Sequence, residues 1–219
     1  MSRYLDESAT RRFYDRFGAR LDRQAFYEDP ALEKLVAVGD FSNARNVMEF
    51  GCGTGRFAER LLSREMPTSA RYAGCDLSQT MVSLTQARLA EYSGRTTIWQ
   101  NPGRPDFDPA HPPFDRIVST FVLDLLAPDA IAAFLRESWR TLKSGGYLCL
   151  VNLTFGARPL SRLTSTIWGG IANINPRLVG GCHPVRIAGR LDQERWKIRH
   201  HSTKSAWSVP FEVTVAERH

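Results

Sequence analysis

The sequence predicts an α/β fold, in which a doubly wound, mostly parallel sheet of about seven strands carries helices on both faces and the last strand runs antiparallel. Two observations predict it. Short apolar segments alternate with helical segments between residues 46 and 153, which is typical of a parallel sheet. The apolar segments at 46–50, 114–120 and 147–153 are nearly continuous, as expected for strands that are buried on both faces.

The individual elements follow from periodicity and from their end signals. Phe13, Phe17 and Leu21 have helical spacing and predict a first helix over 9–25, and Pro30 predicts the start of a second helix over 31–38. We then expect strands and helices in alternation: strands at 46–50, 71–76, 96–100, 114–120 and 147–153, and helices at 56–64, 79–92 and 129–142. Five prolines predict a loop over 101–113.

The chain changes character after residue 153. We expect a short apolar helix around Ile167–Ile174, a last helix over Pro184–Glu194, and two closing strands at 196–205 and 210–218. The pattern of the two strands favours an antiparallel hairpin.

Composition fits one globular domain, because the 219 residues are 42% apolar and 24% charged. The net charge of +6 permits an anionic partner such as nucleic acid. The densest basic stretch, Arg186–Lys204, is interpreted as solvated surface. The sequence shows no signal peptide and no apolar run of the ~20 residues that span a bilayer. We therefore expect a cytoplasmic protein without a transmembrane segment.

The four cysteines, at 52, 75, 149 and 182, show no C-x-x-C spacing. We expect free thiols in a reducing compartment and no metal site.

A glycine-rich turn follows the first predicted strand. Gly51, Gly53 and Gly55 let the chain turn tightly and approach a ligand before the next helix begins. The spacing is G-x-G-x-G, which does not match the dinucleotide fingerprint G-x-G-x-x-G. Glu49 precedes the turn; its charge would repel a pyrophosphate but would attract a cationic ammonium group.

Asp76 ends the second predicted strand. An acid at this distance from a glycine turn commonly accepts hydrogen bonds from ribose hydroxyls. The alternative is that Asp76 caps the following helix.

Four segments together carry a family resemblance: VMEFGCGTGRFAERLL, YAGCDLSQTMVSLTQARL, FDRIVSTFVLDLL and LKSGGYLCLV. In this order they resemble the class I S-adenosylmethionine-dependent methyltransferases over residues 14–151. The small-molecule branch, with ubiquinone/menaquinone-type and phospholipid-type enzymes, is most similar, since it also carries an N-terminal stretch like YDRFGARLD.

The resemblance implies a Rossmann-like fold, S-adenosylmethionine as the cofactor and S-adenosylhomocysteine as its product. It divides the single domain into an N-terminal helical cap (1–40), a cofactor-binding core (41–153), and an acceptor-side lid with closing strands (154–219). It implies that the following residues contact the cofactor: Tyr14, Glu49, Gly51, Cys52, Gly53, Asp76, Leu77, Met81, Asn101, Ser119, Thr120 and Phe121.

The implied roles differ along the cofactor. Glu49 and the glycines lie along the aminoacyl and sulfonium portion, and Asp76 holds the ribose. Leu77 and Met81 pack near the adenine, whose amino group donates to the side-chain carbonyl of Asn101. The segment 119–121 borders the methyl group. Tyr14 either closes over the cofactor or packs in the core.

A sulfonium methyl is already activated, so such an enzyme chiefly aligns the acceptor. A general base is needed only for an acceptor with a high pKa. Asp124 and His183 are the candidates; Asp124 is alternatively a helix cap and His183 an exposed loop residue. The segment Ile167–Ile174, with Trp168 and Gly169-Gly170, is the predicted acceptor lid, and its apolar character favours an aromatic or lipid-like small molecule.

Three other functions stay open. The glycine spacing and Glu49 disfavour a nicotinamide-dependent oxidoreductase. A nucleic-acid methyltransferase is disfavoured because the chain lacks a separate basic domain and an N/D-P-P-Y/F tetrapeptide after the fourth strand. The third is a non-catalytic module that binds S-adenosylmethionine. The sequence leaves the acceptor and the oligomeric state open.

Overall fold

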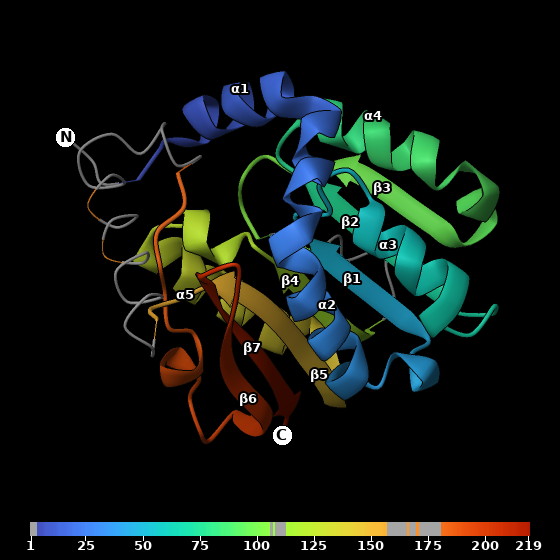
Figure 1. The fold of residues 1–219 in the computed structure, drawn as a ribbon. Helices are drawn as coiled ribbons and strands as arrows, with labels where there is room; N and C mark the ends of the chain where they lie inside the picture. The colour runs from blue at the N-terminus through green and yellow to red at the C-terminus, as the bar shows by residue number, and fades with distance from the viewer. Residues whose placement is uncertain (1–3, 106, 108–112, 157–165, 167–169, 171–180) are drawn as a thin grey trace.

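The computed structural model describes the chain except for residues 1–3, 106, 108–112, 157–165, 167–169 and 171–180. A seven-stranded sheet crosses the molecule in the order β3-β2-β1-β4-β5-β7-β6 (Figure 1). The strands are β1 (Asn46–Phe50), β2 (Arg71–Asp76), β3 (Thr96–Gln100), β4 (Phe114–Thr120), β5 (Leu142–Leu153), β6 (Trp196–Ala206) and β7 (Val209–Arg218). β7 is antiparallel to both β5 and β6, whereas β1 to β5 pair in parallel. The predicted fold class is confirmed.

Helices cover both faces of the sheet (Figure 1). They are α1 (Glu7–Phe17), the 3-10 segment η1 (Gly18–Gln24), α2 (Ala25–Gly39), α3 (Arg56–Arg60) with its π-helical extension η3 (Leu61–Glu65), α4 (Gln79–Arg88) and α5 (Pro128–Thr141). Consecutive residues of a strand pack on opposite faces of the sheet. Val47 belongs to the core layer under α2 and α3, and Met48 belongs to the layer under α5. This alternation explains why the central strands are apolar at nearly every position.

The predicted strands all form, although β5 begins at Leu142 and not at residue 147; several helix predictions are wrong. Pro184–Glu194 is wrong as a helix, because only the 3-10 turn η7 (Ala188–Arg190) forms there. The Glu212 carboxylate accepts hydrogen bonds from the N–H groups of Ile187 and Ala188, so their backbone is fixed by tertiary contacts instead of a helix.

The two N-terminal helices also differ from the prediction. α1 ends at Phe17 because Gly18 has a positive φ of 52°, and α2 begins at Ala25 with Pro30 inside it. Pro30 cannot donate a hydrogen bond to the Phe26 carbonyl. The helix continues because Ala31, Leu32 and other residues on this side are buried. The predicted lid at 167–174 lies, apart from Gly170, outside the described residues.

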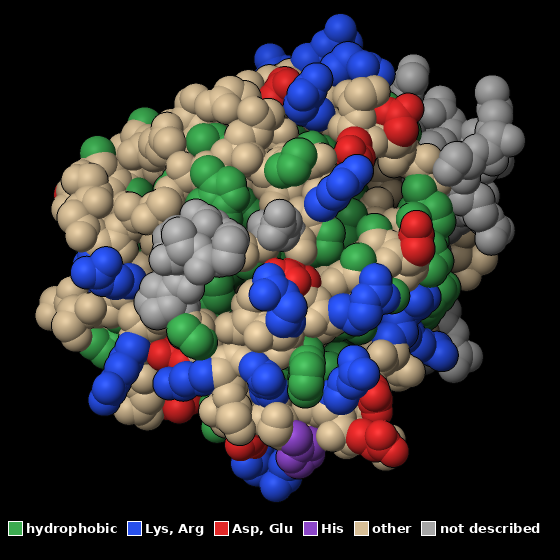
Figure 2. Space-filling view, turned by 180° about the vertical axis from the view of Figure 1, so that it is seen from behind, with side chains coloured by type: hydrophobic (Ala, Val, Ile, Leu, Met, Phe, Trp, Pro, Cys, Tyr) green, Lys and Arg blue, Asp and Glu red, His purple; other side chains and the backbone are tan. Residues whose placement is uncertain are grey.

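The basic stretch near the C-terminus is solvated, as predicted. β6 is the edge strand, and Lys197, Arg199 and Lys204 are exposed on it. Figure 2 shows that Lys and Arg side chains on the rear face are interspersed with Asp and Glu. Cys52, Cys75, Cys149 and Cys182 are free thiols. Within the described ranges, no helix is long and apolar enough to cross a membrane.

Candidate functional site

The glycine turn between β1 and α3 has a conformation that requires glycine. Gly51 has a φ of 80°, and a Cβ atom there would lie 2.3 Å from Cγ2 of Val122. Both Gly51 and Cys52 donate backbone hydrogen bonds to the Cys75 carbonyl, at 2.8 and 3.0 Å. The turn is therefore pressed between the carboxyl ends of β2 and β4, where open α/β sheets bind ligands.

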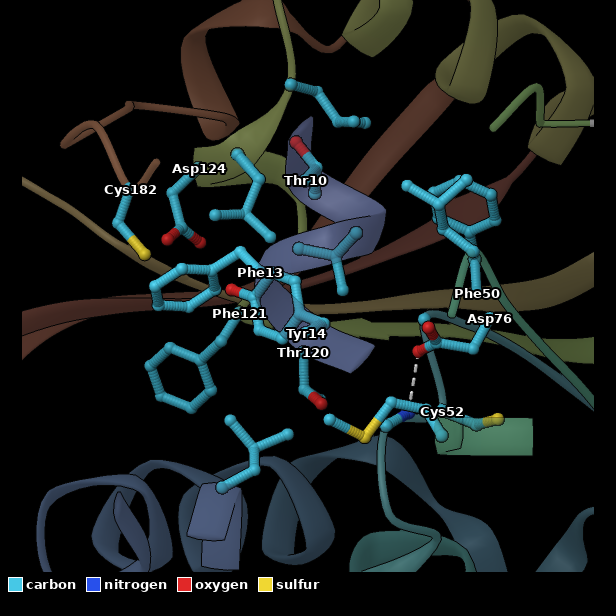
Figure 3. A pocket seen from close by; sticks show the side chains of 18 of the residues that line it. Thr10, Phe13, Tyr14, Phe50, Cys52, Asp76, Thr120, Phe121, Asp124 and Cys182 are labelled. Atoms are coloured by element: carbon cyan, nitrogen blue, oxygen red, sulfur yellow. Dashed lines mark hydrogen bonds between the residues drawn. The ribbon is translucent and has the colours of Figure 1, made fainter. Parts of the chain in front are cut away.

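Asp76 stands at the end of β2, across from this turn. Its Oδ2 accepts from the Gly53 N–H at 2.9 Å, and its Oδ1 accepts from the Ser78 N–H at 2.9 Å. The cap of α4 is Ser78, whose Oγ accepts from the Met81 N–H. Asp76 is therefore not the cap, and its carboxylate faces the site (Figure 3). Burial raises the pKa of Asp76 to about 6.

Glu49 is the most buried acid of the turn, with 1% of its surface exposed. Its Oε2 accepts a hydrogen bond from the Tyr72 hydroxyl. Burial raises the pKa of Glu49 to about 7, because a charge is poorly solvated there. A cationic ligand group beside Glu49 would stabilise its ionised form.

A cavity of about 1050 Å³ runs from the glycine turn past the end of β4. Most of the residues that the sequence analysis selected for the cofactor line it: Tyr14, Glu49, Gly51, Cys52, Gly53, Asp76, Leu77, Met81, Asn101, Thr120 and Phe121. Ser119 does not. Its hydroxyl donates to the Phe50 carbonyl at 3.1 Å, because side chains alternate along β4 and only one set can face the cavity.

The N-terminal helices cover the cavity and are held by polar contacts that the sequence analysis missed. Asp22 pairs with Arg88 at 2.6 Å and accepts from the Thr54 hydroxyl. Glu28 pairs with Arg56 at 2.7 Å. Charged residues at these spacings along a helix give no sequence signal for partners far along the chain, so only the tertiary structure identifies them.

Phe121 lines the end of the cavity that is far from the glycine turn. Its φ of 56° is unusual for a bulky residue. The conformation is held by a 2.7 Å hydrogen bond from its N–H to the Val151 carbonyl, and its ring makes an edge contact with that of Tyr27, with centroids 6.1 Å apart. Such local strain is commonly found at functional sites.

Asp124 lies beyond Phe121, in the 3-10 turn η5 (Leu123–Leu125), and is 1% exposed. It caps no helix, since α5 begins at Pro128 with Ala127 as its N-cap. Neither carboxylate oxygen has a hydrogen-bond partner among the described residues. Burial raises the pKa of Asp124 to about 7.

Cys182 faces Asp124 across the cavity end (Figure 3). The sequence analysis treated it only as a free thiol, and missed its place in the site. His183 follows it but does not line the cavity. Its backbone N–H donates to the Asp124 carbonyl at 2.7 Å, and its ring lies against that of Tyr4, with centroids 4.7 Å apart. Of the two predicted candidates, Asp124 therefore lines the cavity and His183 does not.

Comparison with known proteins agrees with this site. Residues 47–146, which contain the glycine turn, Asp76 and Asp124, match the methyltransferase domain family. This segment of the chain resembles a methyltransferase domain. This match supports the predictions of a methyltransferase and of S-adenosylmethionine as its cofactor, and it does not favour a nicotinamide-dependent oxidoreductase.

Two solved structures share the fold of this chain. The N-methyltransferase NodS from Bradyrhizobium japonicum WM9, in complex with S-adenosylhomocysteine, has a TM-score of 0.71 and 18% identity, with 95% of this chain and 98% of that chain covered. Magnesium protoporphyrin IX methyltransferase (ChlM) from Synechocystis PCC 6803, also with bound S-adenosylhomocysteine, has a TM-score of 0.69 and 17% identity, over 98% of this chain and 100% of that chain. At these identities the likeness concerns the fold alone.

A relative by sequence is the tRNA N(3)-methylcytidine methyltransferase Mettl2 of Drosophila melanogaster. It is 26% identical over 132 residues, which cover 56% of this chain and 39% of that protein. The chain therefore spans well under two thirds of the length of this curated relative.

Proposed function

We propose that this methyltransferase transfers the methyl group of S-adenosylmethionine to a small-molecule acceptor that binds in the same cavity. The observation that carries the proposal is the continuity of the cavity: it contains the glycine turn and Asp76 at one end and Asp124 at the other. Its volume of about 1050 Å³ is at the upper end of the ~300–1,000 Å³ typical of ligand sites. That space suits a cofactor together with an acceptor.

The residues at the glycine-turn end of the cavity match the chemical groups of S-adenosylmethionine. Asp76 holds the ribose, because each of its oxygens keeps a free lone pair besides its backbone donor. Glu49 attracts the ammonium group of the aminoacyl portion. Leu77 and Met81 form an apolar wall for the adenine.

Asn101 supports a different adenine contact from the one inferred from the sequence. Its Oδ1 accepts from the Gly103 N–H at 2.8 Å, while its Nδ2 is buried without a hydrogen-bond partner among the described residues. The Nδ2 group lies near the Cys75 thiol, whose pKa it lowers, and it is the part of the amide that is left to meet a ligand. We infer that it donates to a ring nitrogen of the adenine, since a buried donor without an acceptor is costly.

The sulfonium supplies an activated methyl group when the cofactor is bound. The chain's own task is to position the acceptor for in-line attack and to exclude water. Thr120 and Phe121 border the methyl position from the end of β4, and Tyr14 closes over it from α1. The strained backbone of Phe121 fixes the ring that the acceptor meets.

We propose that three consecutive parts of the chain have different roles. Residues 1–40 form a helical cap over the cofactor, 41–153 form the cofactor-binding core, and 154–219 supply the acceptor side and the closing strands. The ion pairs from Asp22 to Arg88 and from Glu28 to Arg56 hold the cap down. Such a covered cavity suits a small molecule better than a folded RNA.

Calorimetry with S-adenosylhomocysteine tests the proposal directly, with NAD as the control ligand. We expect micromolar or tighter binding of S-adenosylhomocysteine and none of NAD. Incubation with methyl-labelled cofactor and a panel of phenols, amines, lipids and tRNA then identifies the acceptor class. Stabilisation by NAD alone, or labelling of tRNA alone, contradicts the proposal.

A further inference from the structure

The cavity is acidic, although the chain as a whole carries a net charge of +6. Among the described residues that line it, the carboxylates outnumber the cations by eight to one. The acids are Asp6, Glu7, Asp22, Glu28, Glu49, Asp76, Asp124 and Asp129, and the cation is Arg56. A cavity of this charge attracts cations and repels anionic acceptors.

Asp124 differs from the other deeply placed acids because no charged group and no well-placed hydrogen-bond donor among the described residues pairs with it. Glu28 pairs with Arg56, Asp76 accepts from two backbone N–H groups, and Glu49 accepts from Tyr72. Asp124 is 1% exposed, and neither of its carboxylate oxygens has a hydrogen-bond partner among the described residues. The Cys182 thiol and the backbone N–H groups of Asp124 and Leu153 lower its pKa, but burial outweighs them. A buried carboxylate with such weak donors is costly, so its retention at the cavity end points to a further donor supplied by a ligand.

The neighbours of Asp124 provide no compensating charge. The Cys182 thiol faces the carboxylate in Figure 3, and its pKa is raised by burial and then by Asp124. Glu28 is of the same sign and contributes to the raised pKa of Asp124. The rings of Phe121 and Tyr27 line the same end, and aromatic faces attract cations.

The geometry of this end is fixed by backbone contacts. The His183 N–H donates to the Asp124 carbonyl at 2.7 Å, and the Val185 N–H donates to the Leu153 carbonyl at 2.9 Å. The Asn152 amide donates to the Val185 carbonyl at 3.0 Å. Asp124 and Cys182 are thus held against β5 before any acceptor arrives, which reduces the entropy that binding costs.

We propose that the acceptor is an amine and that the Asp124 carboxylate binds its nitrogen. This inference rests on the proposed function and names its substrate class. The amine enters as an ammonium ion and gives one proton to the Asp124 carboxylate. The nitrogen lone pair then forms the N–C bond to the methyl carbon as the C–S bond breaks, with that electron pair going to sulfur. The product leaves as a methylated ammonium ion, and the proton on Asp124 passes to solvent.

The protonation behaviour of Asp124 suits this role. Burial raises its pKa to about 7, so it can take up and release a proton near neutral pH. An acceptor that carries a phosphate or carboxylate near its nucleophile would instead meet Asp124 and Glu28 as repulsive charges.

Cys182 allows a test that does not require the natural acceptor. Two methanethiosulfonate reagents of similar size, one with a trimethylammonium group and one with a sulfonate group, are reacted with the protein saturated with S-adenosylhomocysteine. Labelling at Cys182 is measured by peptide mass spectrometry. The ratio of the two rates is independent of how far the thiol is ionised, because both reagents need the thiolate.

We expect the cationic reagent to react faster by at least about tenfold, and Asp124→Asn to remove most of this preference. Asp129→Asn is the matched control: it removes the same charge from an exposed residue at the cavity rim, where water screens it, so the ratio changes by less than about twofold. A ratio near one, or a ratio that Asp124→Asn does not change, overturns the amine inference.

Methyl transfer to matched acceptors is the second readout: 2-phenylethylamine against 2-phenylethanol, and tryptamine against tryptophol. We expect the wild-type chain to methylate the amine of each pair and Asp124→Asn to lose this activity while it still binds S-adenosylhomocysteine. Preference for the alcohol, or for neither member, overturns the inference and leaves the proposed function standing if S-adenosylhomocysteine binds. If S-adenosylhomocysteine does not bind, the proposed function fails, and the inference fails with it.

Discussion

Replacing Glu49 by glutamine removes a buried negative charge from the glycine turn while it preserves the shape of the side chain. Burial raises the pKa of Glu49 from its ordinary 4.5 to about 7 in the folded chain, so the folded state holds this proton more tightly than the unfolded state does. The contribution of Glu49 to stability therefore falls as the pH rises from about 4.5 through 7. Since each tenfold change in acid dissociation corresponds to ~1.4 kcal/mol, ionised Glu49 costs about 3 kcal/mol above pH ~7.

We accordingly expect Glu49→Gln to raise the free energy of unfolding of the ligand-free chain by about 3 kcal/mol at pH ~8, and by less than about 1 kcal/mol at pH ~5. Urea denaturation followed by tryptophan fluorescence at both pH values measures the difference. Glu59→Gln is the control, because the Glu59 side chain is 44% exposed, and its effect should be the same at both pH values.

The same substitution should weaken the cofactor site, because it removes the proposed partner of the ammonium group. We expect the affinity for S-adenosylhomocysteine at pH ~8 to fall at least about tenfold, as for the loss of a hydrogen bond to a charged group. An equal change in stability at both pH values would refute the reasoning about burial. An unchanged affinity would refute the placement of the ammonium group.

Three further outcomes test the site and its scaffold. Asp76→Ala should lower the affinity for S-adenosylhomocysteine by about 1.5–3 kcal/mol, and a calorimetric affinity that stays the same removes the ribose assignment. Gly51→Ala should destabilise the chain by ~2 kcal/mol or more, because its Cβ would lie 2.3 Å from Val122 and the residue keeps a positive φ. Adding Val122→Ala should recover part of this loss of stability in thermal melts, and the absence of any recovery argues against the clash. Ser78→Ala should cost ~1 kcal/mol, since Ser78 caps α4 by accepting from the Met81 N–H; equal stability in urea would show that the cap is unimportant.

The sequence determined the sheet because the signals that predict each strand lie in consecutive residues. The apolar runs of β1, β4 and β5 need two covered faces, and the glycine turn needs positive φ angles that other residues adopt at a cost. Asp76 was identified for the same reason: its position after a strand and before a helix is a matter of chain order. These features predicted the architecture, the resemblance to methyltransferases and the end of the cavity that is proposed to bind the cofactor.

The tertiary structure decided the conformation of segments whose local sequence signals compete with contacts to residues far along the chain. Residues 184–194 were predicted to form a helix, but hydrogen bonds to Glu212 and Asn152 hold this segment in an irregular course with one 3-10 turn. Ser119 could not be separated from Thr120 by its neighbours in sequence, because strand register alone decides which of them faces the cavity.

The end of the cavity that is proposed to bind the acceptor was also decided by the tertiary structure. Asp124 follows β4, Cys182 lies between β5 and β6, and Glu28 comes from α2, so no spacing in the sequence joins them. Sequence alone predicted a methyl-donor site, because the residues proposed for that site stand at consecutive strand ends. Only the folded chain brings an unpartnered carboxylate, a thiol and aromatic rings to one place, because burial and charge depend on contacts between residues that are far apart in the sequence.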